Sequence, residues 1–379
     1  MLDIGLYIHI PFCERKCFYC DFNSFEGEKA KILPYLKALL KEIELYSHRL
    51  RECRIKTIFI GGGTPSLLMG EDIYNILNTI IKKYRVANNI EITIETNPGT
   101  LRIDKLNDYK TAGINRLSVG LQACQDHHLK RLGRIHSYKE FMDNIKSVKK
   151  IGFNNINVDL MFSLPNQTLN EWRTSLRQMV ELEIPHISAY SLILEEGTAL
   201  YKDYKSKKLV PLKEEQELEM FHYTIDYLKQ KNYNHYEISN FGKEGFECKH
   251  NLIYWNNEFY LGLGAGAHSY MSEGRFNNVV NIDDYIRLLN NGEAPVNEIT
   301  KLTTKDEISE TMFLGLRMMA GVSIPKFKKR FGICPFTIYK DKLVQLEKQN
   351  LITITKDTIK LTPKGIDLAN LVFAEMLIN

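Results

Sequence analysis

Short apolar runs alternate with helical patterns in the first half of the chain, and this rhythm restricts the fold more than any other feature. The apolar positions from Ile73 to Tyr84 recur at three- and four-residue steps, as on one face of a helix. Strands that alternate with such helices indicate βαβ units and a parallel sheet. The six predicted strands are Leu6–Ile10, Thr57–Ile60, Glu91–Glu95, Arg116–Gly120, Asn157–Phe162 and Ile187–Leu192. Periodicity alone does not exclude a doubly wound sheet, but six units favour a partial (β/α)6 TIM-like barrel.

The pattern changes after about residue 195. Glu214–Lys231 reads as a charged amphipathic helix, and a region rich in glycine and aromatic residues follows it. Beyond residue 300, helical patterns lead into a hairpin around Lys356 and Asp357 and then a last helix. This order predicts a smaller, mainly helical, winged-helix-like C-terminal domain. We therefore expect a barrel over residues 1–230, a connecting region that completes the site over 231–300, and a C-terminal domain over 301–379.

Charge and hydropathy exclude several classes of protein. With 50 basic and 46 acidic residues among 379, the net charge is +4, which gives no broad basic surface for nucleic acid. A structural or lid role therefore suits the C-terminal domain better than DNA binding. No stretch reaches the roughly 18 continuous apolar residues of a spanning helix. The N-terminus has Asp3 and His9 in its apolar run and no basic start, unlike a signal peptide, so we expect a cytoplasmic protein.

Three of the seven cysteines lie within eight residues. Cys13, Cys17 and Cys20 form a C-x3-C-x2-C triplet directly after the first predicted strand. Three thiolates on one short loop can ligate three corners of a [4Fe–4S] cluster and leave one iron open. Structural zinc is the alternative, but it usually needs a second pair of ligands, and none lies nearby. The other cysteines are expected to be small buried residues: Cys53, Cys124, Cys248 and Cys334.

Glycines and polar residues mark the ends of the following strands. Gly61, Gly62 and Gly63 with Thr64 and Pro65 come directly after Thr57–Ile60, where a chain without Cβ atoms lets its backbone approach a ligand. Alone, this run is also compatible with an ordinary turn. The polar residues expected at the strand ends, and a basic residue suited to a carboxylate, are Glu95, Gln122, Asp159 and Arg134. Each alone is more typical of a cap, but together they indicate a site.

These motifs resemble the radical S-adenosylmethionine (SAM) superfamily. The resemblance rests on the cysteine triplet after YIHIPF, on GGGTP one strand later and on NVDLMFSLPNQT, and it extends into the C-terminal domain. It implies that the open iron chelates the amino and carboxylate groups of SAM. An electron passed from a donor through the cluster would then release methionine and a 5′-deoxyadenosyl radical. The positions that match SAM contacts are Tyr7, Tyr19, Gly62, Gly63, Thr64, Glu95, Gln122, Arg134 and Asp159.

Within the superfamily, the chain is similar to the coproporphyrinogen-oxidase-like branch. That branch contains an oxygen-independent coproporphyrinogen III oxidase, which decarboxylates two propionates of a porphyrinogen, and HemW-type haem chaperones, which bind and deliver haem. Phe22 stands where the oxidase pattern has a fourth cysteine, and only twelve residues precede Cys13, too few for the N-terminal arm of the oxidase. The run His250-Asn251-Leu-Ile-Tyr254-Trp255 matches the H-N-x-x-Y-W motif of the chaperones. A haem chaperone is thus expected, with the oxidase as the alternative; no catalytic residue is assigned.

The resemblance also implies a place for haem. A neutral His250 imidazole suits haem iron, and Tyr254 and Trp255 could form an apolar wall for the porphyrin. Without the resemblance, a hydrogen-bonded histidine in the barrel mouth is the better interpretation. The alternative ligand is Cys248, and the residues expected to line the same cleft are Tyr236, Glu237, Asn240 and His268. Dimerisation and delivery to membrane-bound haem proteins are further implications, although no amphipathic anchor is evident.

Overall fold

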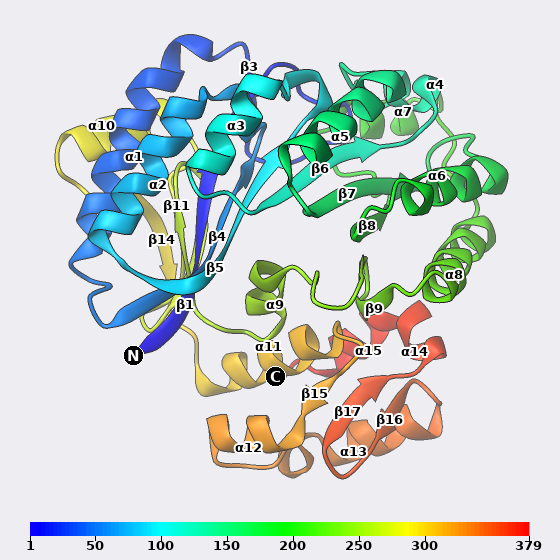
Figure 1. Cartoon of the computed structure of the whole chain (residues 1–379). Helices are drawn as coiled ribbons and strands as arrows, with labels where there is room; N and C mark the ends of the chain where they lie inside the picture. The colour runs from blue at the N-terminus through cyan, green and yellow to red at the C-terminus, as the bar shows by residue number, and fades with distance from the viewer. Residues whose placement is uncertain (379) are drawn as a thin grey trace.

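Six parallel strands follow one another in chain order and confirm the predicted α/β rhythm. The structure is a computed structural model and describes residues 1–378. Figure 1 shows the strands side by side with helices covering their outer face. The strands are β1 (Leu2–Ile10), β4 (Cys53–Gly62), β5 (Arg85–Thr96), β6 (Arg116–Gln122), β7 (Asn155–Phe162) and β8 (His186–Ser191). Each predicted strand lies within one of them, except that β8 ends one residue before Leu192.

The outer helices are held by one apolar face each. They are α1 (Ile32–Ser47), α2 (Gly70–Lys83), α3 (Ile103–Thr111), α5 (Tyr138–Ile151), α6 (Leu169–Glu181) and α8 (Glu214–Gln230). In α2, Ile73, Leu77 and Ile80 are fully buried, as the sequence predicts. Ile81 belongs to the predicted run of apolar positions from Ile73 to Tyr84, but it is 52% exposed, because one residue beyond Ile80 turns the helix by about 100° away from the buried stripe. The opposite face of the strands turns inward and carries polar side chains.

Residues 231–300 add strands to both edges of the sheet. β11 (Tyr260–Leu263) pairs parallel with β1, and β12 (His268–Met271), β13 (Gly274–Asn278) and β14 (Val296–Thr300) continue that edge antiparallel. At the other edge, β10 (Asn240–Gly242) and β9 (Asn234–Glu237) follow β8. The described sheet therefore has twelve strands. Between the two edges, α9 (Lys249–Trp255) packs against β1 and β4, and α10 (Ile282–Asn290) packs against α1.

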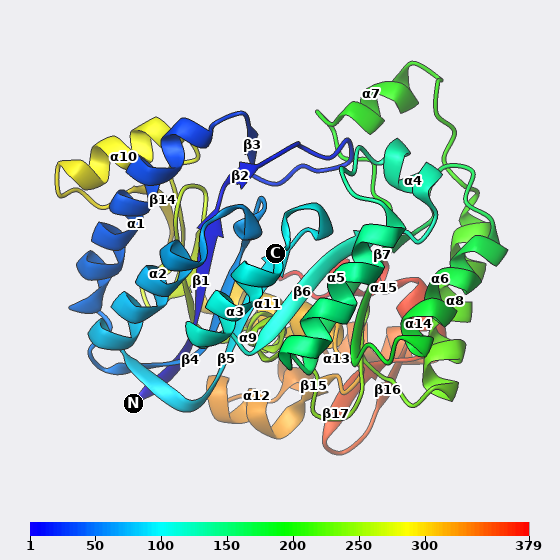
Figure 2. The ribbon, with the colours of Figure 1, turned by 45° about the horizontal axis from the view of Figure 1, so that its top comes forward.

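The C-terminal domain has a core of its own and is mainly helical. Its helices are α11 (Thr304–Leu316), α12 (Ile324–Phe331), α13 (Pro335–Lys348), α14 (Pro363–Asp367) and α15 (Ala369–Glu375). A three-stranded sheet of β15 (Val322–Ser323), β17 (Thr358–Leu361) and β16 (Ile352–Ile354) contains the predicted hairpin. Met312, Phe327 and Leu343 are among its buried residues. Figures 1 and 2 show this domain, in orange and red, on the side of the sheet away from the outer helices.

The remaining features concern the thiols and the question of membrane spans. Cys53, Cys124 and Cys248 are buried as predicted, whereas Cys334 is partly exposed because it stands at the N-cap of α13 on the surface of the small domain. Within residues 1–378, none of the helices has the length and apolar character needed to cross a bilayer. Short elements complete the description: β2 (Phe12–Cys13), β3 (Phe25–Glu26), α4 (Asp126–Arg131) and α7 (Ala199–Lys205).

Candidate functional site

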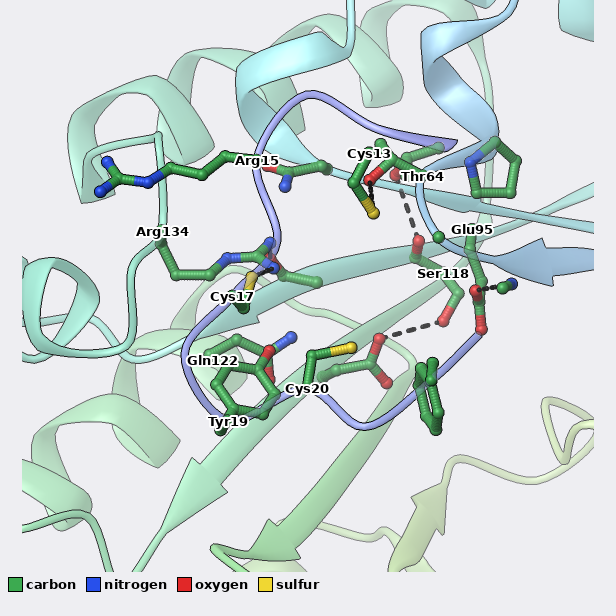
Figure 3. A pocket seen from close by; sticks show the side chains of 18 residues that line it. Cys13, Arg15, Cys17, Tyr19, Cys20, Thr64, Glu95, Ser118, Gln122 and Arg134 are labelled. Atoms are coloured by element: carbon green, nitrogen blue, oxygen red, sulfur yellow. Dashed lines mark hydrogen bonds between the residues drawn. The ribbon is translucent and has the colours of Figure 1, made fainter. Parts of the chain in front are cut away.

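The thiols of Cys13, Cys17 and Cys20 line one pocket at the C-terminal end of β1. Figure 3 shows all three on a single loop, with their sulfur atoms turned toward the pocket. The loop is closed by the pairing of β2 with β3 and by Lys16, whose Nζ donates to the Phe22 and Ser24 carbonyls. Among residues 1–378, no other cysteine lines this pocket. The donor set is therefore three sulfur atoms from one rigid loop.

Burial keeps two of the thiols protonated, whereas neighbouring hydrogen-bond donors favour their metal-bound thiolate form. Burial raises the pKa of Cys13 and Cys20, so both are thiols at neutral pH until a metal displaces the proton. The Thr64 hydroxyl donates to Cys13 Sγ at 3.6 Å, and Arg134 Nη1 donates to Cys17 Sγ at 3.3 Å. Hydrogen-bond donors and a positive charge beside sulfur stabilise the thiolate that a metal needs.

The glycines after β4 are fitted against this loop. Gly63 N donates to the Ile10 carbonyl at 2.8 Å, and Thr64 N donates to the Phe12 carbonyl at 2.8 Å. A Cβ on Gly63 would lie 2.7 Å from the Phe12 carbonyl oxygen and 3.0 Å from Cys13 Sγ. Gly62 has a φ of +113°, and a Cβ there would lie 2.6 Å from the His9 ring. Larger residues would push the thiol loop outward, so the run of glycines is a requirement of this close approach.

Carboxylates from neighbouring strands form the inner wall of the pocket. Glu95 on β5 accepts from Gly62 N at 3.0 Å, and burial together with Asp159 raises its pKa to about 8. Asp159 on β7 accepts from Ser118 and Asn157, and burial raises its pKa as well. Glu95 is therefore mostly protonated at neutral pH. A cation bound here would favour its ionised form.

A basic residue and a strained backbone position complete the pocket. Arg134 Nη2 donates to the Gly120 carbonyl, while its Nε is buried without a partner among residues 1–378. Gln122 has a φ of +74° at a register shift between β6 and β7, which turns its side chain into the pocket. Strain of this kind is common at ligand sites. The unpartnered Arg134 nitrogen suits a ligand with a carboxylate.

The pocket gathers most of the residues that the sequence analysis expected to contact SAM. Beside the three cysteines it is lined by Tyr19, Gly62, Gly63, Thr64, Glu95, Gln122, Arg134 and Asp159. Tyr7 is the exception, because it lines the adjoining cavities rather than the thiol pocket, with its hydroxyl 2.9 Å from His9 Nδ1. Ser118 also lines the pocket and was not expected, since a serine within a strand carries no motif.

A wider cleft opens beside the thiol pocket and shares Phe22, Gly62 and Glu95 with it. Its volume is about 640 Å³. Tyr254 and Trp255 line it as predicted, and so does His268. The C-terminal domain also contributes lining residues that were not expected, because they lie on a helix without a recognisable motif: Glu310, Phe313 and Leu314 of α11.

His250 does not reach this cleft. Its ring is 1% exposed and stacks on Phe59, with Nδ1 2.7 Å from Thr57 Oγ1 and Nε2 2.8 Å from the Tyr254 hydroxyl. Burial and then the Arg116 charge lower its pKa to about 3, so the ring is neutral. Both ring nitrogens are therefore occupied. These contacts are those of the hydrogen-bonded histidine that the sequence analysis gives as the alternative. His250 lines a smaller adjoining cavity with Tyr7 and Glu95, and its ligation of haem stays a prediction.

The other residues expected around haem are also engaged elsewhere. Cys248 is fully buried against Glu91, and burial raises its pKa to about 12. Tyr236 is hydrogen-bonded to His186 at 2.8 Å. Glu237 is fully buried, with Arg317 of the C-terminal domain at 3.5 Å and Asn240 as partners. These side chains hold the structure together behind the cleft and are not part of its lining.

Comparisons with known proteins agree with this geometry. The model of the radical SAM superfamily matches residues 7–179, and that of the HemN C-terminal domain matches residues 302–368. The chain is 39% identical to heme chaperone HemW of Bacillus subtilis over 98% of each chain. The chain belongs to the HemW family of radical SAM proteins. HemW of Lactococcus lactis is 36% identical over 98% of this chain and 97% of that one, and HemW of Escherichia coli is 40% identical over 70% and 69%.

The same fold occurs in the solved structure of coproporphyrinogen III oxidase (HemN) from Escherichia coli. The TM-score is 0.85, with 99% of this chain and 90% of that chain covered and 21% identity. The resemblance shows a shared fold. For a HemW-family chain, radical SAM membership implies a [4Fe–4S] cluster and SAM. The pocket fits both groups, since it offers three thiols, a backbone that approaches closely, and a buried Arg134 nitrogen that has no partner in the described part of the chain.

Proposed function

We propose that this HemW-family protein binds haem as cargo and transfers it to haem-requiring proteins. The observation that carries the proposal is the wide aromatic cleft directly beside the thiol pocket. Support comes from the 39% identity over 98% of the chain to a protein named heme chaperone HemW. Cofactor sites are typically concave and mostly apolar, with a few polar groups that fix orientation. The cleft has this character.

In this proposal, the thiol pocket holds the cluster and SAM. Cys13, Cys17 and Cys20 supply three thiolates to the cluster. The backbone at Gly62 and Gly63 and the side chain of Thr64 hold the amino end of SAM. The remaining SAM contacts are assigned to Tyr7, Tyr19, Glu95, Gln122, Arg134 and Asp159. When bound, the two groups together supply one-electron reduction of a sulfonium.

The thiol pocket and the wide cleft share part of their lining, so a ligand bound in the pocket can change the charge on the wall of the cleft. Gly62 and Glu95 line both of them, and Glu95 accepts from Gly62 N. A cation held near Glu95 would favour loss of its proton, which changes the charge on the wall of the cleft as well. We assign to this wall the link between SAM binding and the cargo. The further partners in the proposal are a one-electron donor and haem-accepting proteins, including membrane-bound ones, with a homodimer as the expected assembly.

The alternative function is that of an oxygen-independent coproporphyrinogen III oxidase. The shared fold keeps this alternative open. Against it stands Phe22, which is 62% exposed at the loop position where the sequence analysis expects a fourth cysteine in the oxidase. Anaerobic incubation with coproporphyrinogen III, SAM and a reductant separates the two. Formation of protoporphyrinogen IX would establish the oxidase and overturn the chaperone proposal.

Haem transfer itself is the direct test. The cluster-loaded protein is expected to bind one haem per chain, seen as a shifted Soret band on titration with hemin. Addition of apomyoglobin, a general haem acceptor, should move the Soret band to that of holomyoglobin. The titration is repeated with and without SAM. Absence of a saturable Soret shift in both conditions would contradict the proposed function.

Substitution of Arg134 tests the SAM site separately. We expect Arg134→Met to weaken SAM binding by about 10- to 100-fold, because charge-assisted hydrogen bonds contribute about 1.5 to 3 kcal/mol each. Iron content should remain unchanged, since Arg134 is a donor to Cys17 and not a ligand. The measurement is equilibrium dialysis of labelled SAM with the reconstituted protein.

The matched control is Arg102→Met. Arg102 is 73% exposed and pairs with Asp104 on the surface, so its loss should leave SAM affinity as in the wild type. Equal SAM affinity in the Arg134 and Arg102 variants would contradict the prediction that Arg134 binds the carboxylate of SAM. Loss of iron in the Arg134 variant would instead make it a support of the cysteine loop.

A further inference from the structure

Among residues 1–378, three histidines lie around the wide cleft, and only one of them has a ring without a hydrogen bond. His9 lines the cleft, but its Nδ1 accepts from the Tyr7 hydroxyl at 2.9 Å and its Nε2 donates to the Asn23 carbonyl at 2.7 Å. His250 is closed off in the same manner by Thr57 and Tyr254. His268 is exposed at the start of β12 and lines the cleft. Within residues 1–378, its ring makes no hydrogen bond.

We propose that His268, rather than His250, is the protein ligand of the haem iron, with the porphyrin in the cleft between β12 and α11. The inference rests on the proposed function, since it names the haem site of the same protein. A neutral imidazole with an unoccupied nitrogen is the commonest protein ligand for haem iron. Ligation by His250 would first require the loss of one of two buried hydrogen bonds, whereas ligation by His268 requires none.

The backbone that carries His268 is held in a fixed place. A Cβ on Gly262 would lie 2.2 Å from the His268 carbonyl oxygen, so β11 and the start of β12 are in direct backbone contact. Gly264 and Gly266 between them have φ values of +103° and +75°, which suit glycine in a tight turn. Gly264 N donates to the buried Glu42 carboxylate at 2.8 Å. The imidazole is therefore carried by a rigid turn, as a ligand position requires.

The other cleft walls suit a flat, largely apolar group. Tyr254 and Tyr260 meet edge to face with ring centroids 4.6 Å apart, and Trp255 lies beside them. Phe313 and Leu314 of α11 form the wall from the C-terminal domain. Aromatic and aliphatic side chains of this kind pack against a porphyrin without unpaired polar groups. A volume of about 640 Å³ lies within the range of cofactor sites.

One cation also lines the cleft in the described part of the chain. Arg275 on β13 is 30% exposed, and its guanidinium forms two 2.7 Å hydrogen bonds with Glu310 of α11. A haem propionate at this rim would compete with Glu310 for Arg275. Since Glu310 belongs to the C-terminal domain, such an exchange would bring the propionates to the boundary between the two domains. We assign the propionate end of the porphyrin to this side.

A single free imidazole also agrees with a cargo that has to leave. One axial bond leaves the opposite face of the iron open to a ligand from the acceptor protein. Transfer then needs the exchange of one iron–nitrogen bond and not of two. His9 and His250 cannot supply the second bond while their rings remain hydrogen-bonded.

Hemin titration of three variants tests the assignment. His268→Ala, prepared as the full chain with its cluster, should bind hemin at least about 10-fold more weakly and lose the spectrum of histidine-ligated iron. In His268→Gly, added imidazole should restore that spectrum, as seen by resonance Raman and electron paramagnetic resonance. The matched control is His127→Ala, because His127 is 65% exposed on α4 and does not line the cleft. It should bind hemin as the wild type does.

The outcomes separate this inference from the proposed function. If the wild type shows no saturable hemin binding, the proposed function itself fails. If the wild type binds hemin and His268→Ala gives the same affinity and the same spectrum, only the His268 assignment fails. His250→Ala tests the competing assignment. If this variant lost the histidine-ligated spectrum and His268→Ala kept it, His250 would be the ligand of the haem iron. Imidazole rescue confined to the His268→Gly variant would support the inference.

Discussion

Cys17→Ser should lose nearly all cluster iron when the protein is reconstituted anaerobically with iron and sulfide. The three thiols are the whole sulfur donor set of the pocket in the described chain, and the cluster already has one iron without a protein ligand. Removal of Cys17 would leave two irons of the cluster without a protein ligand. It would also leave Arg134 Nη1, which donates to Cys17 Sγ at 3.3 Å, without its sulfur partner. Iron and sulfide analysis and electron paramagnetic resonance after dithionite measure the loss.

Cys334→Ser is the matched control for this experiment. Cys334 is partly exposed at the N-cap of α13 and does not line the thiol pocket, so its substitution should leave iron content and the resonance signal unchanged. Circular dichroism melting of both variants shows whether the fold is retained. If Cys17→Ser kept full iron content and the wild-type signal, the triplet would not hold the cluster, and the assignments of SAM contacts that depend on it would fail as well.

The sheet could be predicted where its strands are long and apolar. β4 and β7 bury alternate or continuous runs of isoleucine, valine and leucine, and such runs stand out in the sequence. β11 is a parallel strand next to β1, but it has only four residues, Tyr260–Leu263, and one of them is glycine. β5 begins at Arg85, six residues before the predicted start at Glu91. The prediction missed its first half because that half contains two asparagines, which are unfavourable in strands. Pairing with neighbours overrides local preference in both elements.

The thiol pocket and the cleft differ in how far the sequence could predict them. The cysteine loop and Gly61–Gly63 are contiguous motifs, and backbone hydrogen bonds from Gly63 and Thr64 join the two. The cleft instead depends on residues that packing brings together, such as Phe313 on α11. His250 shows the limit most clearly. Its motif predicts a metal ligand, which stays a prediction, and no local pattern could show that its Nδ1 lies beside Thr57, 193 positions away in the chain.

Glu42→Ala is expected to lower the free energy of unfolding by about 4 kcal/mol. Glu42 on α1 is fully buried and accepts hydrogen bonds from Tyr285, Asn278 and Gly264 N. Alanine would leave the Tyr285 hydroxyl and Gly264 N without an acceptor and the Asn278 amide with the Gly264 carbonyl alone, at about 1 to 3 kcal/mol for each lost bond before relaxation. Urea unfolding of the cluster-free chain measures the change. Glu44→Ala on the same helix is the control, because Glu44 is 58% exposed and its pairing with Lys83 contributes little.

This carboxylate also supports the turn that leads to the cleft. Gly264 N donates to Glu42, and the Tyr35 hydroxyl, which accepts from Ala265 N at 3.1 Å, donates to the His9 carbonyl at 2.7 Å. Loss of Glu42 would therefore loosen the segment between β11 and His268 before the rest of the sheet. Hydrogen exchange should show faster exchange at Gly264 and Ala265 in Glu42→Ala than in Glu44→Ala. Equal exchange rates at Gly264 and Ala265 in the two variants would contradict the role of Glu42 in supporting this turn.

The pH dependence of the free energy of unfolding tests whether Glu42 is protonated in the folded chain. Burial raises the pKa of Glu42 from 4.5 to about 7, so the folded chain holds a proton that the unfolded chain releases. The stability that this proton contributes is complete below about pH 4.5 and is lost as the pH rises to about 7. Glu42→Gln cannot ionise, and its stability should fall less than that of the wild type across this window. If both chains showed the same slope in urea unfolding between these pH values, Glu42 would be ionised in the folded protein, and its three donors would then be holding a charge.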